Sequence, residues 1–269
     1  GYVAAHGAGQ GAGLLAGAAG GAAMGLVFAA LVVGLRVQQV IAGTALSMLG
    51  LALTASLHRA HAALVPTDSL PPVAITRVPL LADVPVLGPA FFAQPMATYL
   101  LYVVFPVISW MLYRSIAGVA LRATGESPMA VVAAGHSPAR IQSLAIIAGG
   151  ALAGTGGAIL SVVHAGTFVD GMTAGRGFVA VAIVALGRWT PLGVATSALV
   201  FGAVSAVQYL AQSLGWRVPY PLVLAAPYAV TLVAMAVFRG HRPPPSQLRS
   251  EEHTSELQSH HDLVCRLLL

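Results

Sequence analysis

The stretch Arg114–Arg140, RSIAGVALRATGESPMAVVAAGHSPAR, decides how the rest of the chain is arranged. It lies between two segments that are apolar enough to cross a bilayer, and its arginines are Arg114, Arg122 and Arg140. Short loops that carry arginine stay on the cytoplasmic side of a membrane. We therefore expect a cytoplasmic loop here, and its orientation sets that of the whole chain.

Local signals inside this loop predict a short helix. The segment Glu126–Pro128 is typical of a helix start, because proline suits an early helical position and an acid suits the positive end of the helix dipole. Met129–Ala134 is then a short helix that Gly135 ends as a left-handed cap, and Ser137–Pro138 opens the next helix. Such a helix suits the transmission of a push from a soluble partner to the membrane helices. An ordinary surface loop is the alternative, and the residues alone leave both open.

The composition excludes a soluble globular protein. Hydrophobic residues make up 57% of the chain, charged residues 8%, and the mean hydropathy is +0.83, so a single soluble core cannot bury the apolar surface. The 13 basic residues are all arginine and lie mostly at segment ends, which indicates topology signals and lipid headgroups rather than nucleic acid. The single cysteine, Cys265, excludes a disulfide framework and a cysteine zinc site.

Six segments are long and apolar enough to cross a hydrocarbon layer of about 30 Å as helices. They are Gly11–Leu35, Val37–Leu57, Met96–Tyr113, Ile141–Val163, Pro191–Leu214 and Val218–Phe238. Phe178–Leu186 is apolar but too short to cross alone, which predicts a re-entrant element or half-helix. The proline-rich stretch His58–Gln94 predicts an external loop, with a short interfacial stretch near Val84–Phe92. The expected fold is all-α: a polytopic membrane bundle of about six spans, a short re-entrant element and a cytoplasmic coupling helix.

Glycines recur at every fourth position of the first predicted span, at Gly13, Gly17, Gly21 and Gly25. This spacing places them on one helix face, where small residues let a neighbouring backbone approach closely. Filler rich in glycine and alanine is the alternative interpretation.

The arginine distribution agrees with a cytoplasmic central loop. If the short element counts as a crossing, seven arginines lie inside: Arg36, Arg114, Arg122, Arg140, Arg188, Arg239 and Arg242. Four lie outside: Arg59, Arg77, Arg176 and Arg217. This bias is the one that the positive-inside rule requires, and the inverted topology reverses it.

The two ends of the chain differ from its middle. Gly1 lacks an initiator methionine, and we expect a transmembrane domain over residues 1–248 that is truncated at its N-terminus. Residues 249–269 hold half of all acidic residues and the only cysteine, and RSEEHTSELQS resembles the translation of a sequencing-library adapter. We expect this tail to be non-native.

Two long motifs carry a family resemblance. LRATGESPMAVVAAGHSPARIQSLAIIAGGALAGTGGAIL (121–160) resembles the coupling loop and following helix of bacterial ABC importer permeases of the ribose, branched-chain amino acid and simple-sugar group. GTFVDGMTAGRGFVAVAIVALGRWTPLG (166–193) resembles the nucleoside permeases that work with basic-membrane-protein-type lipoproteins. The resemblance covers about Gly11–Arg242. Ser127 and Met129 depart from it, because the family more often has Asn and Arg there.

The resemblance implies a subunit of the bacterial inner membrane that imports nucleosides or simple sugars. The implied partners are a cytoplasmic ATPase that holds ATP-Mg, a second permease, an extracytoplasmic substrate-binding lipoprotein and membrane lipid, with no nucleic acid. It places coupling to the ATPase on six residues: Gly125, Glu126, Pro128, Ala134, Gly135 and Arg140. We expect this chain to bind no cofactor itself, because its sequence lacks the GxxxxGK[ST] motif that cradles phosphate.

Polar and aromatic residues in or near the spans are candidates for the solute pathway. Polar groups are costly in lipid and usually face a cavity or another helix, and amides together with aromatic rings suit the hydroxyls and base edges of nucleosides. They are Gln38, Gln39, Ser47, Phe168, Thr173, Arg176, Phe178 and Gln208. Hydrogen bonds between helices are the alternative role of each amide and hydroxyl. Two interpretations of Arg176 stay open: it pairs with Asp170 in the loop, or it meets the docking lipoprotein. His58 and His136 are expected to be solvated surface residues, and no metal site is expected.

Two other function classes fit less well. A secondary transporter coupled to ions or protons needs carboxylates within its spans, and the predicted spans contain none. A membrane-embedded enzyme needs a cluster of acids, bases or metal ligands at bilayer depth, which the sequence does not show. The residues leave open which solute is carried and whether the two permeases of a pair are identical.

Overall fold

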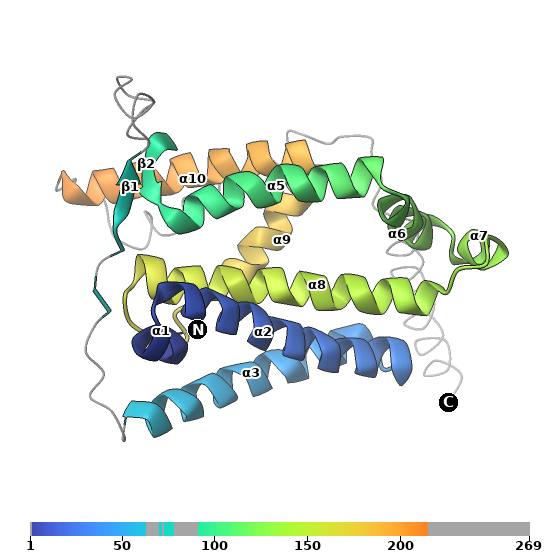
Figure 1. The fold of residues 1–269 in the computed structure, drawn as a ribbon, viewed down its shortest axis with the longest axis horizontal. Coiled ribbons are helices and arrows are strands. Elements are labelled where there is room, and N and C mark those ends of the chain that lie inside the picture. The colour runs from blue at the N-terminus through green and yellow to red at the C-terminus, as the bar shows by residue number, and fades with distance from the viewer. Residues whose placement is uncertain (1, 63–69, 72, 78–90, 215–269) are drawn as a thin grey trace, which may run out of the picture. The chain divides into compact units, whose positions relative to one another are not determined.

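The computed structural model describes residues 2–62, 70–71, 73–77 and 91–214, and Figure 1 shows that these residues are almost entirely helical. The expected all-α class is confirmed, apart from one short two-stranded ladder. The chain divides into two compact units. The first comprises Gly1–Thr124 and Pro128–Ala174, and the second comprises Gly125–Ser127 and Gly175–Leu269. Each unit is described by itself.

Four of the described helices are long and apolar enough to cross a membrane: Gln10–Gly34, Gln39–His61, Met96–Arg114 and Pro138–His164. They correspond to the first four predicted spans. The fifth predicted span is helix α10 (Pro191–Ser213), whose described apolar part, Pro191–Val207, is shorter. The sixth predicted span, residues 218–238, and the predicted non-native tail, residues 249–269, lie outside the described residues. The protein is thus a multi-pass helical membrane protein, and the count of six remains a prediction.

The first unit begins with three consecutive helices. The short α1 (Tyr2–Ala8) precedes α2 (Gln10–Ala29), which continues as the π-helical η1 (Ala30–Gly34). Arg36 has a left-handed backbone (φ 56°) and turns the chain into α3 (Gln39–Ala62). The expectation that the external loop starts at His58 was wrong, because α3 continues to Ala62; the first proline, Pro66, comes only after it.

Parts of the predicted external loop form the short ladder. Strands β1 (Ile75–Arg77) and β2 (Ala93–Pro95) pair antiparallel, with Thr76 opposite Gln94. The Tyr99 hydroxyl, one turn into the next helix, donates to the Thr76 carbonyl oxygen at 2.9 Å and ties the ladder to that helix. The predicted interfacial stretch near Val84–Phe92 lies mostly outside the described residues.

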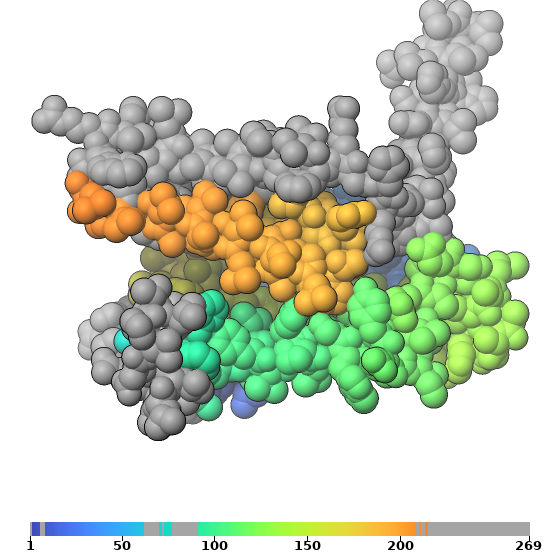
Figure 2. Space-filling model, turned by 90° about the horizontal axis from the view of Figure 1, so that it is seen from above, coloured from blue at the N-terminus to red at the C-terminus, as the bar shows by residue number. Residues whose placement is uncertain are grey.

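The central part of the chain follows this ladder. Helix α5 (Met96–Arg114) runs through Pro106 without a break, and α6 (Ile116–Glu126) and α7 (Pro128–Ala133) follow it. Figure 2 shows β2, α5, α6 and α7 in chain order along one side of the space-filling view. The side chains of Leu101, Val103 and Trp110 on α5 are each about 60% exposed, as expected of a surface that faces lipid.

The main packing contact of this unit joins α2 to α8 (Pro138–Ala158), which continues as the π-helical η2 (Ile159–His164). A Cβ atom placed on Gly21 would lie 2.7 Å from the Cα atom of Gly154, and one on Gly25 would lie 3.2 Å from the Cα atom of Ile147. The two backbones therefore touch, which only glycine permits. The close-packing interpretation is confirmed for Gly17, Gly21 and Gly25, and the partner is α8.

These contacts make α2 and α8 antiparallel, because Gly17 meets Ala158 while Gly25 meets Ile147. At one end of the pair, Val33 and Gly34 lie beside Ala139 and Arg140; we call this the Arg140 end. At the other end α8 passes through η2 into the loop that holds Asp170, and we call this the Asp170 end. Arg36 follows Gly34 closely and shares the Arg140 end, whereas Arg59 lies at the Asp170 end, where it pairs with Asp170. This grouping matches the predicted sidedness of the three arginines.

The second unit contains a tight helical hairpin of α9 (Arg176–Leu186) and α10. Arg188 and Trp189 both have left-handed backbones, with φ 56° and 59°, and turn the chain between the helices. The Thr190 hydroxyl donates to the Gly187 carbonyl oxygen at 3.0 Å and accepts the Gly193 N–H at 3.2 Å, so it caps α10. The prediction of a helix too short to cross alone is confirmed for α9.

Candidate functional site

The predicted coupling helix is α7, and its end is a complete capping motif. Gly135 has a left-handed backbone (φ 81°). Its N–H donates to the Val132 carbonyl oxygen at 2.9 Å, and the His136 N–H donates to the Val131 carbonyl oxygen at 3.0 Å. This pair of hydrogen bonds is the Schellman motif, which stops a helix where glycine accepts the left-handed conformation. The predicted stop at Gly135 is confirmed.

Both junctions of α7 are short. Helix α6 ends at Glu126 and α7 begins at Pro128, so a single residue separates them. The expected helix start is confirmed one residue early, but Glu126 belongs to the end of α6 rather than to the first turn of α7. Ser137 precedes α8 as its N-cap residue and Pro138 occupies its first turn, as predicted. A helix held between such short turns moves with its neighbours.

The two faces of α7 differ in exposure. Val131 is only 3% exposed, so this side of α7 is buried. Met129 is 81% exposed and Val132 is 58% exposed. Residues three apart in a helix lie on the same face. The outer face of α7 therefore presents two adjoining apolar side chains to solvent, as a docking surface for a soluble partner does.

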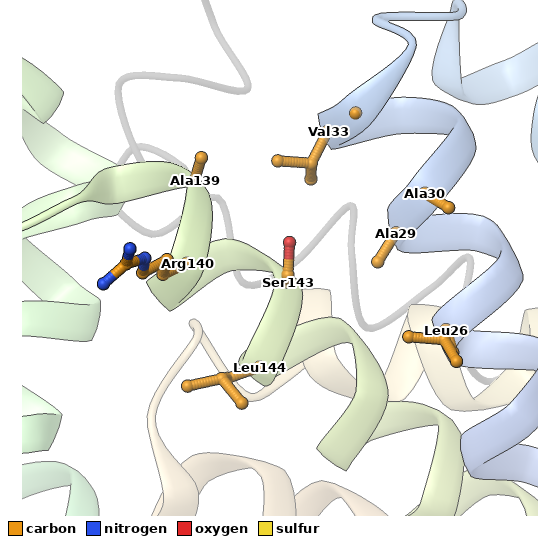
Figure 3. Close-up of a pocket in the computed structure, with 9 residues that line it drawn as sticks. Leu26, Ala29, Ala30, Val33, Ala139, Arg140, Ser143 and Leu144 are labelled. Atoms are coloured by element: carbon orange, nitrogen blue, oxygen red, sulfur yellow. The ribbon is translucent and has the colours of Figure 1, made fainter.

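An open groove of about 570 Å³ lies at the Arg140 end between α2 with η1 and α8 (Figure 3). Leu26 of α2 and Val33 of η1 point toward α8. The Arg140 guanidinium extends from α8 on the side away from α2. Aliphatic side chains make up most of the lining, and Ser143 adds one hydroxyl. None of the predicted pathway residues lines this groove, so it is not the expected site for a polar solute.

The structure does not gather the eight predicted pathway residues into one site. Gln38 lies in the turn before α3, at the Arg140 end, and not within a span as expected, whereas Gln39 is the first residue of α3. The reason is that α3 starts two residues later than predicted. Ser47 lies on an exposed part of α3, where its hydroxyl donates to the Thr44 carbonyl oxygen of its own helix at 2.7 Å.

The remaining pathway candidates belong to two regions. Phe168 and Thr173 lie in the loop at the Asp170 end of the first unit. Arg176 and Phe178, the latter 83% exposed, lie in the first turn of α9, and Gln208 lies in α10, all in the second unit. They remain separate candidates.

A small core at the Asp170 end was not expected from the sequence. Buried Tyr2, Ala5, Leu70 and Val162 form it, and Phe168 packs against it. The ring of His58 lies with its centroid 4.8 Å from that of Phe168 and 6.0 Å from that of Tyr2. The expectation that His58 is a solvated surface residue was wrong, because α3 carries it beneath two aromatic rings. His136 is exposed, as expected.

Of the two interpretations of Arg176, the structure does not show the one that pairs it with Asp170. The Asp170 carboxylate pairs with Arg59 of α3 at 3.5 Å, with the two side chains 44% and 78% exposed. Arg176, the partner considered from the sequence, follows six residues later in the next helix. No sequence signal indicates Arg59, because the two residues of the pair are 111 positions apart. Among the described residues, no group of three or more His, Cys, Asp or Glu side chains is placed to hold a metal ion.

Comparison with known proteins agrees with this architecture. Guanosine ABC transporter permease protein NupQ of Bacillus subtilis (strain 168) is 32% identical over 224 residues, which cover 82% of this chain and 70% of that protein. Nucleoside ABC transporter permease protein NupC of Lactococcus lactis subsp. cremoris (strain MG1363) is 29% identical, over 79% of this chain and 68% of that protein. Putative glucose ABC transporter permease protein TsgC13 of Haloferax volcanii is 36% identical, over 70% of this chain and 57% of that protein. No solved structure matches.

The resemblance to ABC permeases of the nucleoside and simple-sugar group is thereby confirmed, and the chain is a transport subunit rather than an enzyme. The family model for permease components of branched-chain amino acid transport systems matches residues 2–238, nearly all of the part that carries the predicted spans. The chain belongs to this family of ABC transporter permeases.

Proposed function

We propose that this chain forms part of the path by which a nucleoside or a simple sugar enters a bacterial cell across the inner membrane. The printed names of the relatives support this substrate class, since they are a guanosine, a nucleoside and a putative glucose permease. ATP-Mg is bound and hydrolysed by a separate cytoplasmic ATPase, and this chain holds no cofactor. A second permease and an extracytoplasmic substrate-binding lipoprotein complete the assembly.

The observation that carries the proposal is the geometry of α7. Its C-terminal Schellman motif at Gly135 and its short junctions on both sides join it closely to α8. Its inner face buries Val131, and its outer face presents Met129 and Val132. An apolar patch on a stiff short helix suits a partner that pushes, because the force passes directly into the α2–α8 pair.

Six residues have a coupling role in this proposal. Gly135 gives the cap, Pro128 gives the start of α7, and Arg140 lies in the first turn of α8; the others are Gly125, Glu126 and Ala134. The eight pathway candidates named above retain their proposed role, with α9 as the half-helix and six spans in total. The end that carries Arg36 and Arg140 faces the cytoplasm.

The proposal is tested by reconstituting the full assembly in proteoliposomes, with the ATPase facing the lumen as it faces the cytoplasm in a cell. Uptake of labelled guanosine and of labelled glucose is measured with and without ATP enclosed in the lumen. We expect Val132→Asp to abolish ATP-driven uptake, because a charge on the outer face of α7 weakens an apolar contact with the ATPase. His136→Asp is the matched control: it adds the same side chain four residues away, at an exposed position whose backbone N–H still caps α7.

Normal uptake by the Val132→Asp protein refutes the role of α7. Uptake that follows a proton or sodium gradient without ATP refutes the ABC mechanism and supports the secondary transporter instead. If the assembly hydrolyses ATP but takes up neither guanosine nor glucose, the substrate class is refuted.

A further inference from the structure

The segment Gly166–Ala174, which we call the strap, links η2 to the second unit without forming a helix or a strand. Its own backbone hydrogen bonds join close neighbours, as in the bond from the Met172 N–H to the Val169 carbonyl oxygen at 3.1 Å. Its fixed position therefore depends on contacts with distant parts of the first unit.

Three contacts of different kinds hold the strap. The Gly166 carbonyl oxygen accepts the Leu70 N–H at 2.8 Å. The Phe168 ring packs on His58, and the Asp170 carboxylate pairs with Arg59. Two of these contacts go to consecutive residues near the end of α3, so the strap is fastened to that helix end.

The closed strap covers groups that would otherwise meet water. Val162, 1% exposed, and Tyr2, 4% exposed, lie in the core against which Phe168 packs. The His58 Nδ1 atom is buried and has no hydrogen-bond partner among the described residues. A buried polar atom without a partner destabilises the state that buries it. The Phe168 ring of the strap lies 4.8 Å from the His58 ring, so lifting the strap exposes one side of this histidine to water.

The strap also has the features of an element that opens as a unit. Gly166 and Gly171 have left-handed backbones, with φ 61° and 73°, and Ala174 at the far end has φ 43°. Gly166 and Ala174 lie at the two ends of the strap, where hinge residues absorb the backbone rotation when a segment lifts. The Arg59–Asp170 pair is exposed, so solvent screens it and it resists opening only weakly.

We propose that the strap is a releasable closure of the Asp170 end: it lifts off α3 to let solute pass and closes again behind it. This inference rests on the proposed function, because a closure at that end serves a protein that passes solute from outside. The strap holds two of the pathway candidates, Phe168 and Thr173, and Phe168 is the residue that fastens it. Phe168 is accordingly a gating residue.

The test fastens the strap covalently. The full assembly carries Arg59→Cys and Asp170→Cys in a Cys265→Ser background, so no other thiol is present in the chain. A short reducible bis-methanethiosulfonate bridges the two thiols, because an arginine side chain spans more distance than a direct disulfide. We expect uptake to fall in proportion to the bridged fraction and to return on reduction. The control bridges Thr76→Cys to Gln94→Cys in the β1–β2 ladder and leaves uptake unchanged.

Full uptake by the bridged protein overturns the proposal, and so does an equal loss from the control bridge. A second readout does not depend on transport. Val162→Cys in the Cys265→Ser background gives one thiol beneath the strap, and a membrane-impermeant maleimide reports its exposure. We expect Phe168→Ala to speed this labelling several-fold, whereas equal rates with and without Phe168 overturn the proposal. If Phe168→Ala speeds labelling in an assembly that takes up no solute, the result supports the opening of the strap and refutes only the proposed function.

Discussion

Replacing Gly154 with alanine tests the contact that organises the first unit. A Cβ atom at this position would meet the Gly17 carbonyl oxygen and would lie 2.8 Å from the Gly21 Cα atom and 2.9 Å from the Gly21 nitrogen. All three are backbone atoms, so no side chain can rotate away. Carbon atoms in contact prefer a separation of about 3.5–4.0 Å. Gly154→Ala therefore forces α2 and α8 apart.

The magnitude follows from a comparison with Gly157→Ala. A Cβ atom on Gly157, in the same helix, would meet nothing within 4 Å. Both substitutions gain the helix preference of alanine over glycine, about 0.5–1 kcal/mol, and this gain cancels between them. Overpacking remains, and it costs about 1–3 kcal/mol. We expect Gly154→Ala to be less stable than Gly157→Ala by about that amount.

The assay is thermal unfolding of both variants and the parent protein in the same detergent. A difference of 1 kcal/mol shifts the Tm by about 2–4 °C in a chain of this size class. We expect the Tm of Gly157→Ala to equal or exceed that of the parent and the Tm of Gly154→Ala to lie below both. Equal Tm values for the two variants refute the reasoning, because they would mean that the backbones of α2 and α8 do not touch at Gly154.

Three further substitutions test local elements by the same unfolding measurement. Gly135→Ala places a Cβ atom on a left-handed backbone (φ 81°), which costs about 1–2 kcal/mol; unchanged stability contradicts the cap of α7. Thr190→Ala removes the cap that binds the Gly193 N–H at 3.2 Å, and about 1 kcal/mol should be lost while Thr190→Ser retains most of it. Tyr99→Phe removes the hydrogen bond to the Thr76 carbonyl oxygen, which should cost about 0.5–1.5 kcal/mol; no loss means that the ladder is not tied to α5 there.

Much of the helical framework was predictable because its signals are local. Each of the first four predicted spans is a helix long enough to cross a membrane, since an uninterrupted apolar run makes all its backbone hydrogen bonds within itself. The stop at Gly135 and the start at Ser137–Pro138 were correct for the same reason, as caps involve only neighbouring residues. Helix ends without a helix-breaking residue nearby were predicted less accurately. Helix α3, for example, continues past His58 to Ala62.

The candidate site was predictable only in part. The short helix α7 follows from its caps, but the exposure of Met129 and Val132 and the burial of Val131 depend on what α7 packs against. The pathway candidates were chosen by residue type, as polar or aromatic residues in or near the spans, yet the structure separates Gln38 and Gln39 from Phe168 by the length of the α2–α8 pair.

The sequence by itself determined that this is a multi-pass helical membrane protein, that its first span has a face of small residues, and that a short capped helix interrupts its middle. These properties depend on apolar run length, residue spacing and cap chemistry, all of which act over a few residues. Only the tertiary structure decided that α8 receives the glycine face, that His58 is covered by Phe168, and that Asp170 pairs with Arg59. Such pairs join segments up to 111 residues apart, and their choice depends on which surfaces fit together when the helices pack.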